Sequence, residues 1–500
     1  MPRKTLVALC SLALVGWALR LRALDAPPFD FHPTRQYYAL IFADDLRHTL
    51  CGDPASAEAQ AARENRRDEA LLEPPLLPAV GALGGCIAGR DAMSPVARGL
   101  IALVWCLGAL AAGALAEALG ATLLGAALCA AWMLFHPYAF AAGRSFQPDA
   151  PMVAILLFAS WQWVTGLRRV APRRVEYAAL AFGLAVLVKL VAIFLVAGVM
   201  AGGLIATRCT PTGFVRRYRR AVWVGLAAIT PAALWYADGF FGHGFLRTQS
   251  QGRFQPHLLT TQAFWDALAL RVDAVVGLGA FWLSLGLATL TAGRAARAVT
   301  LGWLAGQLAL GLVFTFHIYT HDYYNLPLIP FAGLGLGLGV SALERALARH
   351  TPRLALGAVT ALALGAAALS GRAVRDAWRD AASAVSAGQA TVVDAASVGA
   401  RVRHTPHVLV QAPWYGLALK FTGQFAAEYW PETLDIAEES PMLSPAERAA
   451  RRYKGEVFRY FVLGDAASLG AQPALAAWLG ATHSCNAEGR RSRVYRRNGL

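Results

Sequence analysis

Four short stretches bring together acidic, basic and aromatic side chains that could do chemistry. They are FDFHPTRQ (residues 29–36), EPPL (residues 73–76), GRSFQPDAP (residues 143–151) and FHIYTHDYYNLPLIP (residues 316–330). A carboxylate can act as general base toward a hydroxyl or an amine. Arginine, lysine and histidine can hold a phosphate leaving group, and tyrosines can stack on sugar faces. Together these groups suit the transfer of a sugar from a phosphate-linked donor.

Membrane-spanning helices must position these stretches. The chain has 500 residues, of which 56% are hydrophobic and 15% charged, and its apolar residues form long runs. A bilayer core of about 30 Å needs about 20 apolar helical residues per crossing. We therefore predict an α-helical polytopic membrane protein with about 11 transmembrane helices, near residues 5–22, 96–117, 121–137, 149–166, 176–188, 190–207, 221–237, 267–290, 299–316, 325–342 and 353–371. The pair around Lys189 fits either one long tilted helix or two short helices that meet at the lysine.

The basic residues predict the orientation of these helices. They cluster at residues 3–4, 168–174, 216–220, 294–297 and 345–353, in alternate loops, which the positive-inside rule assigns to the cytoplasmic side. The four stretches then share the outer face, although hundreds of residues separate them. Arg20 and Arg22 break the pattern at the outer end of the first helix, either as interfacial anchors or as part of a site for an anionic ligand.

Charge and cysteine content narrow the function classes. The formal net charge of +15 resides mostly in membrane-flanking clusters and in the tail, so we expect no nucleic acid partner. The seven cysteines show no metal-binding spacing. Cys51 and Cys86 share the first outer loop, and a disulfide between them is a hypothesis. The N-terminal apolar run has no convincing cleavage site, which favours a retained signal anchor.

We predict two domains. Residues 1–371 form the transmembrane domain, in which residues 24–94 are a large first outer loop with juxtamembrane helices. The segment from Arg35 has apolar residues at helical spacing, which predicts a short amphipathic helix on the membrane surface. Residues 372–500 form a soluble α/β domain on the outer face, with strands in residues 407–413 and 457–465 and a capped helix in residues 444–453.

The order and placement of these motifs resemble polytopic GT-C glycosyltransferases. The nearest branch contains protein O-mannosyltransferases and the bacterial transferases that add 4-amino-4-deoxy-L-arabinose to lipid A. The resemblance rests on Asp30 in the first outer loop, EPPL, RSFQPDAP (residues 144–151), LAVLVK (residues 184–189) and HDYYNLPLIP (residues 321–330). It implies an inverting transferase in the bacterial cytoplasmic (inner) membrane, with the active site facing the periplasm.

The resemblance also implies partners. These are a polyprenyl-phosphate sugar donor, membrane lipids and an envelope acceptor, which is a lipid, a glycan or a protein. No nucleotide motif occurs, which agrees with a donor already activated as a lipid phosphate. Many relatives carry an Asp-Glu pair in the first loop, whereas here Phe31, His32 and Pro33 follow Asp30. A divalent metal and the acceptor class therefore stay open.

Carried over residue by residue, the resemblance implies site roles. Asp30 is the candidate general base or acceptor-orienting residue, and Asp149 is a second acid near the active site. The candidates for substrate binding are His32, Arg35, Gln36, Glu73, Arg144, Lys189, His317, His321, Asp322, Tyr323 and Tyr324.

Structural roles compete with these assignments for three of the residues. Asp30 could cap the helix that follows it, Asp149 could simply begin the fourth span, and Arg144 could anchor at lipid headgroups.

Similar alternatives apply to the remaining candidates. Lys189 lies in an apolar run, where a charge is costly unless it snorkels or meets a partner. His317 and His321 could hold a metal if they were helical. Tyr323 and Tyr324 could be aromatics of the membrane interface.

Other activities compete with glycosyl transfer from a lipid monophosphate. An oligosaccharide ligase or polymerase would use a lipid pyrophosphate donor. A lipid or sugar transporter would place ionisable residues at mid-membrane and show internal repeats, but the charges here gather at the outer ends. A membrane scaffold would leave the outer acids replaceable.

Overall fold

The computed structural model describes residues 2–244, 246–247, 253–350, 352–402, 405, 407–432, 443–454 and 456–499. The chain forms two compact units. The first consists of Met1–Leu24, Leu71–Pro74 and Arg98–Arg379, and the second of Asp25–Ala70, Pro75–Ala97 and Asp380–Leu500. The first outer loop thus divides between the units, with nearly all of it in the second.

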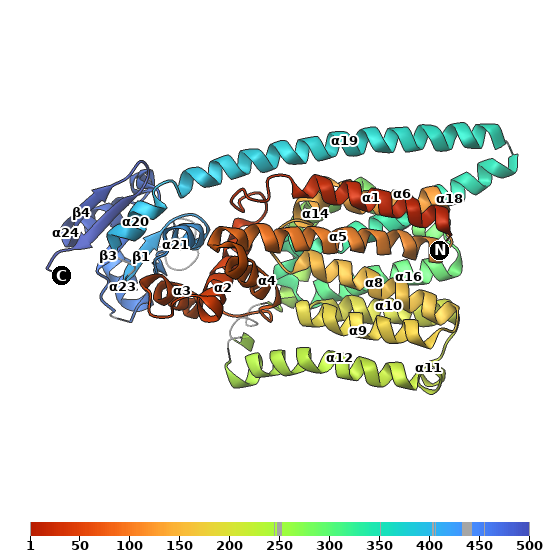
Figure 1. Cartoon of the computed structure of the whole chain (residues 1–500), viewed down its shortest axis with the longest axis horizontal. Coiled ribbons are helices and arrows are strands. Elements are labelled where there is room, and N and C mark those ends of the chain that lie inside the picture. The colour runs from red at the N-terminus through yellow and green to blue at the C-terminus, as the bar shows by residue number, and fades with distance from the viewer. Residues whose placement is uncertain are drawn as a thin grey trace. The chain divides into compact units, whose positions relative to one another are not determined.

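The first unit is a bundle of helices, most of which run side by side (Figure 1). They are α1 (Arg3–Leu21), α5 (Met93–Ala118), α6 (Leu123–Phe135), α7 (Pro137–Ala142), α8 (Asp149–Arg168), α9 (Pro172–Val188), α10 (Ala192–Thr207), α11 (Pro211–Arg217), α12 (Arg219–Ala237), α14 (Gln262–Val276), α15 (Leu278–Leu290), α16 (Arg294–Val313), α17 (Thr315–Thr320), α18 (Leu328–His350) and α19 (Pro352–Thr391). Every segment predicted as a span is largely helical. Two short helices, α9 and α10, meet at Lys189, as the second alternative predicted.

The helix lengths bear on the predicted number of crossings. Among the described residues, six helices are long and apolar enough to cross a membrane, and eight if each of two bent pairs is one span. The bent pairs are α10 with α11, at 90°, and α14 with α15, at 82°. The helix α6, at 13 residues, is shorter than a full crossing requires, and α9, at 17 residues, lies at the lower limit. Length and composition therefore do not establish the predicted count of about 11.

Small residues allow the central helices of this bundle to pack closely. Gly198 and Gly202 on α10 face Gly302 and Gly306 on α16, and a Cβ atom added at Gly198 or Gly302 would collide with the carbonyl oxygen of the other. Such pairs of glycines four residues apart are typical of membrane helices whose backbones touch. The two helices thus form a tight core beneath the break at Lys189.

Arg20 is buried within the bundle. Its guanidinium donates hydrogen bonds to the carbonyl oxygens of Gly16, at 3.1 Å, Leu134, at 2.7 Å, and Ala139, at 3.4 Å, and lies 4.6 Å from the ring centroid of Phe140. Carbonyl groups at the end of α6 lack partners within their own helix. Arg20 donates a hydrogen bond to one of these carbonyl groups. The alternative of an exposed interfacial anchor at this position is therefore wrong.

The second unit combines the first outer loop with the C-terminal region. Its helices and strands are α2 (Pro33–Cys51), α3 (Ala57–Asp68), α4 (Leu76–Ala88), α20 (Ala395–Val402), β1 (Val408–Gln411), α21 (Leu417–Gly423), β2 (Glu428–Tyr429), α23 (Pro445–Arg452), β3 (Tyr460–Leu463), α24 (Pro473–Thr482), β4 (His483–Glu488) and β5 (Arg493–Arg497). The strand order is β2-β1-β3-β5-β4, with β1 parallel to β2 and β3, and β5 antiparallel to β3 and β4. The predicted α/β character is confirmed, as is the helix capped by Ser444 and Glu447.

Specific bonds join the first-loop helices to the C-terminal region. Asn65 on α3 is buried; its side-chain amide donates to the carbonyl oxygen of Phe425, at 2.9 Å, and accepts from the backbone N–H of Ala427, at 3.4 Å. On α2, Leu40 and Ile41 are buried by protein. One face of this helix is therefore packed inside the unit, and its position on the membrane surface stays a prediction.

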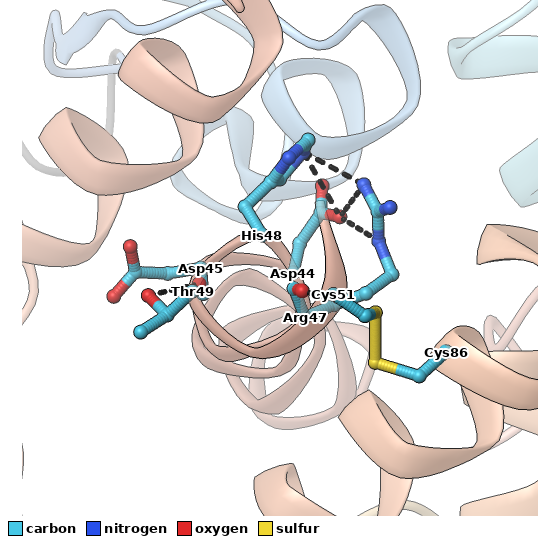
Figure 2. Close-up of a disulfide and its surroundings, with 7 residues drawn as sticks. All are labelled: Asp44, Asp45, Arg47, His48, Thr49, Cys51 and Cys86. Carbon is cyan, nitrogen blue, oxygen red and sulfur yellow. Dashed lines mark hydrogen bonds and ion pairs between the residues drawn. A yellow bond between two sulfur atoms is a disulfide. The ribbon is translucent and has the colours of Figure 1, made fainter. Parts of the chain in front are cut away.

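A disulfide joins α2 to α4. Cys51 and Cys86 are bonded, with their Cα atoms 5.8 Å apart, which confirms the hypothesis from the sequence. About two turns before Cys51, the buried carboxylate of Asp44 accepts hydrogen bonds from Arg47 on the same helix and from Arg90, which follows α4, both at 3.1 Å. Figure 2 shows Asp44 and Arg47 on α2, together with Cys51 and its disulfide to Cys86. Covalent and ionic links thus hold the same pair of helices.

Candidate active site

A buried ion pair lies where α8 begins and α9 ends. The Lys189 Nζ donates to Asp149 Oδ1 at 2.6 Å, and the two residues are 3% and 1% exposed. Asp149 is the first residue of α8, where a carboxylate also interacts favourably with the helix dipole. The expected role as a helix start and a role in a site are therefore both compatible with its position.

The chain positions Lys189 by interrupting a helix. Its backbone is extended, with φ −155° and ψ 121°, so the side chain leaves the helix end instead of lying on a helix face. The Lys189 ammonium lies 4.4 Å from the ring centroid of Tyr324 and 5.1 Å from that of Tyr323. An ammonium over tyrosine faces gains a cation–π attraction that is stronger where water is excluded. Lys189 therefore meets partners instead of snorkelling.

Two histidines extend this aromatic group. The rings of His317 and His321 stack with centroids 5.1 Å apart and planes at 12°, and the edge of Tyr324 meets His317 at 5.4 Å. His317 belongs to α17 and His321 follows its last residue. Both tyrosines are buried, which does not fit exposed aromatics of the membrane interface. Lys189, Tyr323, Tyr324 and the two histidines thus form one cluster.

Tyr138 on α7 joins the cluster through Asp322. Its hydroxyl interacts electrostatically with Asp322, Asp149 and Tyr323. Burial, and then the charges of Asp322 and Asp149, raise the pKa of Tyr138 well above its usual value. The phenol therefore stays protonated and acts as a hydrogen-bond donor.

Glu73 also lies near the break between α9 and α10. It interacts electrostatically with Tyr236 on α12, and the oxygen of Tyr236 accepts a hydrogen bond from the backbone N–H of Leu190 at 3.2 Å. Glu73 therefore lies within electrostatic range of a tyrosine that binds the backbone next to Lys189.

The sequence analysis missed three residues of this region. Tyr138 and Tyr236 lie in apolar runs without a distinguishing signal. Gln147 does lie in a quoted motif, two residues before Asp149. It is fully buried, and neither atom of its side-chain amide has a hydrogen-bond partner among the described residues. Asp149 Oδ2 likewise has none. A buried polar atom without a partner is costly, so the two Gln147 amide atoms and Asp149 Oδ2 are candidates for contacts with a substrate.

Arg144 makes different contacts. Its guanidinium donates to the carbonyl oxygens of Arg22 and Ala23, both at 3.1 Å, and lies 4.6 Å from the ring centroid of Trp378. The side chain is buried, which does not fit an anchor among lipid headgroups. Arg144 instead binds the backbone of the two residues that directly follow α1.

The acid of the first loop belongs to the second unit. Asp30 is partly buried, and its carboxylate accepts a hydrogen bond from the Gln36 amide at 3.3 Å. The same amide donates to the carbonyl oxygens of Pro28 and Phe31, so Gln36 fixes the loop that carries Asp30. His32, with φ 44°, is the cap residue of α2. The competing role of Asp30 as the helix cap is therefore wrong.

Two further observations complete the sites. Arg35 lies on α2 with its guanidinium 5.7 Å from the ring centroid of Tyr38.

Across the described part of the chain, no three His, Cys, Asp or Glu side chains gather as metal ligands, and His317 and His321 stack face to face.

Comparison with known proteins supplies the family context. Residues 73–235 match the family model described as dolichyl-phosphate-mannose-protein mannosyltransferase. No curated protein matches the sequence significantly. ArnT from Cupriavidus metallidurans in the apo state is similar in structure, with a TM-score of 0.57 and 18% identity over 98% of this chain and 97% of that chain.

Two other solved structures share the fold. ArnT from Cupriavidus metallidurans bound to undecaprenyl phosphate has a TM-score of 0.54 and 17% identity over 98% of this chain and 97% of its own. The apo oligosaccharyltransferase of Archaeoglobus fulgidus has a TM-score of 0.55 and 13% identity over 95% of this chain and 71% of its own. The expected resemblance is confirmed: the chain shares the fold of ArnT and of the archaeal oligosaccharyltransferase, and residues 73–235 match the mannosyltransferase family model.

Proposed function

We propose that the chain is an inverting transferase that moves a sugar from a polyprenyl-phosphate donor to an envelope acceptor outside the bacterial cytoplasmic membrane. The buried pair of Lys189 and Asp149 under Tyr323 and Tyr324 carries this proposal. The ammonium of Lys189 pairs with the donor phosphate as negative charge develops there, and a preorganised cation in a dry site stabilises that charge strongly. The structure of ArnT bound to undecaprenyl phosphate supports this donor class.

The remaining candidates have distinct roles in this proposal. Asp30, fixed by Gln36, removes the proton from the acceptor hydroxyl or amine. The acceptor forms the new bond to the anomeric carbon, and the pair of electrons of the broken bond passes to the phosphate oxygen. Asp149 holds Lys189 through Oδ1, and its Oδ2 is open to a hydrogen bond from the substrate. Tyr138 donates to Asp322 and keeps that carboxylate oriented.

Transfer of labelled sugar to membrane extract tests the proposal. The donors are synthetic polyprenyl monophosphate and pyrophosphate sugars, and the variants are Asp30→Asn and Lys189→Met. Matched controls are Asp25→Asn in the same loop and Lys454→Met, both at exposed positions. We expect the monophosphate donors to react and each site variant to lose at least about 100-fold in rate, while the controls keep it.

The outcomes separate the alternatives. Undiminished transfer by Asp30→Asn removes Asp30 as the base. Reaction of the pyrophosphate donors alone identifies a ligase or polymerase instead.

A further inference from the structure

Two adjoining cavities lie on α5, α8 and α9, away from the candidate active site. One is an apolar groove of about 430 Å³ whose lining includes Leu107, Phe158 and Tyr177. These side chains are exposed on the outside of the bundle. The other is a pocket of about 270 Å³, lined by Ala114, Glu117, Ala118, Trp161, Thr165, Arg168, Arg169 and Arg174.

The two cavities continue into one another along the same helix faces. Phe158 of the groove and Trp161 of the pocket are three residues apart on α8, and their ring centroids lie 6.1 Å apart. Tyr177 of the groove and Arg174 of the pocket are also three residues apart, on α9. Residues at this spacing are neighbours on a helix surface. The apolar groove therefore lies beside the pocket that is lined by three arginines.

The pocket holds its polar groups in place. The Arg174 Nη1 donates to Gln162 Oε1 at 3.2 Å, and its guanidinium lies 5.8 Å from the ring centroid of Trp161. Arg168 donates to the carbonyl oxygen of Ala118. Thr165 is only 6% exposed, and its hydroxyl has no hydrogen-bond partner in the described part of the chain. Guanidinium groups and a hydroxyl donor match the oxygens of a phosphate.

Glu117 adds an opposite charge at the rim of the pocket. It lines the same cavity, yet it makes no ion pair with the three arginines among the described residues. A headgroup with a phosphate and an amine would satisfy both signs of charge. Simple retention of arginines on the cytoplasmic side would require neither a cavity nor a buried hydroxyl without a partner.

We propose that α5, α8 and α9 bind one phosphatidylethanolamine molecule. Its phosphate lies among Arg168, Arg174 and the Thr165 hydroxyl, its ammonium faces Glu117, and one acyl chain lies in the apolar groove. Asp149 and Arg168 are the first and last of the 20 residues of α8, so about 29 Å of helix separates them. That length is close to the thickness of the hydrocarbon core. The lipid therefore belongs to the leaflet opposite the candidate active site and is distinct from the sugar donor.

Native mass spectrometry of the full-length protein in detergent tests this site. The probes are phosphatidylethanolamine, phosphatidylglycerol, undecaprenyl phosphate and soluble glycerophosphoethanolamine. We expect wild type to prefer phosphatidylethanolamine, and Arg168→Gln/Arg174→Gln to bind it at least about tenfold more weakly. The control Arg173→Gln/Arg216→Gln removes two exposed arginines that do not line the pocket and should bind like wild type.

A second variant keeps the test independent of folding losses. Glu117→Gln should bind phosphatidylglycerol as well as phosphatidylethanolamine, because only the amine loses its partner. Equal loss in the control variant, displacement of bound phosphatidylethanolamine by an equimolar amount of undecaprenyl phosphate, or full competition by glycerophosphoethanolamine would each overturn the proposal. The last of these would identify a site for a free phosphate ester.

Discussion

Removal of Lys189 should expose the cost of burying Asp149. At 2.6 Å, two unit charges attract by about 6 kcal/mol at an effective dielectric constant of about 20. Much of this attraction offsets the desolvation of both groups, so it is no measure of net stability. In Lys189→Met, however, a carboxylate that is 1% exposed remains without its cation. Truncating one partner of a buried pair costs about 3–5 kcal/mol, which is the loss we expect.

The double variant Lys189→Met/Asp149→Leu should behave differently. It removes both charges and fills the space with apolar groups of similar size. Such replacements are often neutral or stabilising, so we expect an unfolding free energy within about 1 kcal/mol of wild type. The double variant should therefore be at least about 2 kcal/mol more stable than Lys189→Met.

Unfolding by SDS in mixed micelles, followed by tryptophan fluorescence, measures both values. The sugar-transfer assay on the same preparations separates stability from catalysis, since the double variant should fold well and remain inactive. Equal stability of Lys189→Met and wild type would refute the argument for a costly buried pair. Transfer by the double variant would refute the role of Lys189 at the donor phosphate.

Two further predictions concern the second unit. Cys51 and Cys86 are 35 residues apart, and for this separation the chain-entropy model predicts that the disulfide stabilises the fold by about 4 kcal/mol. The variant Cys51→Ala/Cys86→Ala should therefore unfold at a lower denaturant concentration than the control Cys485→Ala. Equal unfolding midpoints would contradict this prediction. Burial, together with Glu428 and Glu69 and against Lys420, raises the pKa of Asp68 from 3.8 to about 6. The folded state then binds this proton more tightly than the unfolded chain, so stability should fall as pH rises from about 4 to 6. Asp68→Asn should flatten that slope in unfolding measurements between pH 4 and 7, and an unchanged slope would exclude Asp68 as its source.

Local sequence signals were sufficient to predict the positions of the helices and one part of the candidate site. Apolar runs predict where helices form, because a backbone in lipid must satisfy its own hydrogen bonds. The lysine inside such a run predicts a break or a partner, and Lys189 has both. Strand patterns and the capping box of residues 444–447 worked for the same reason, since their determinants are neighbours in sequence.

These local signals could not predict contacts between residues that are far apart in the sequence. Tyr138 meets Asp322 across 184 positions (322 − 138), and nothing around Tyr138 marks it as different from other aromatics in apolar runs. Arg20 was expected to be an interfacial anchor or part of a site for an anionic ligand, but the carbonyl group of Leu134 at the end of α6 binds it instead. The number of crossings stays a prediction, because α6 has only 13 residues and two pairs of helices are bent.

The assembly of the second unit from both ends of the chain has a consequence for biosynthesis. Residues 98–379, which number 282 (379 − 98 + 1), separate its first-loop helices from its C-terminal region. At about 5–20 residues per second, the ribosome needs roughly 14–56 s to make that interval. Throughout this time the C-terminal residues that later pack against α2, α3 and α4 have not yet been synthesised. The Cys51–Cys86 bond involves this early segment alone, so its oxidation can hold the nascent hairpin in register until β1 and α21 emerge.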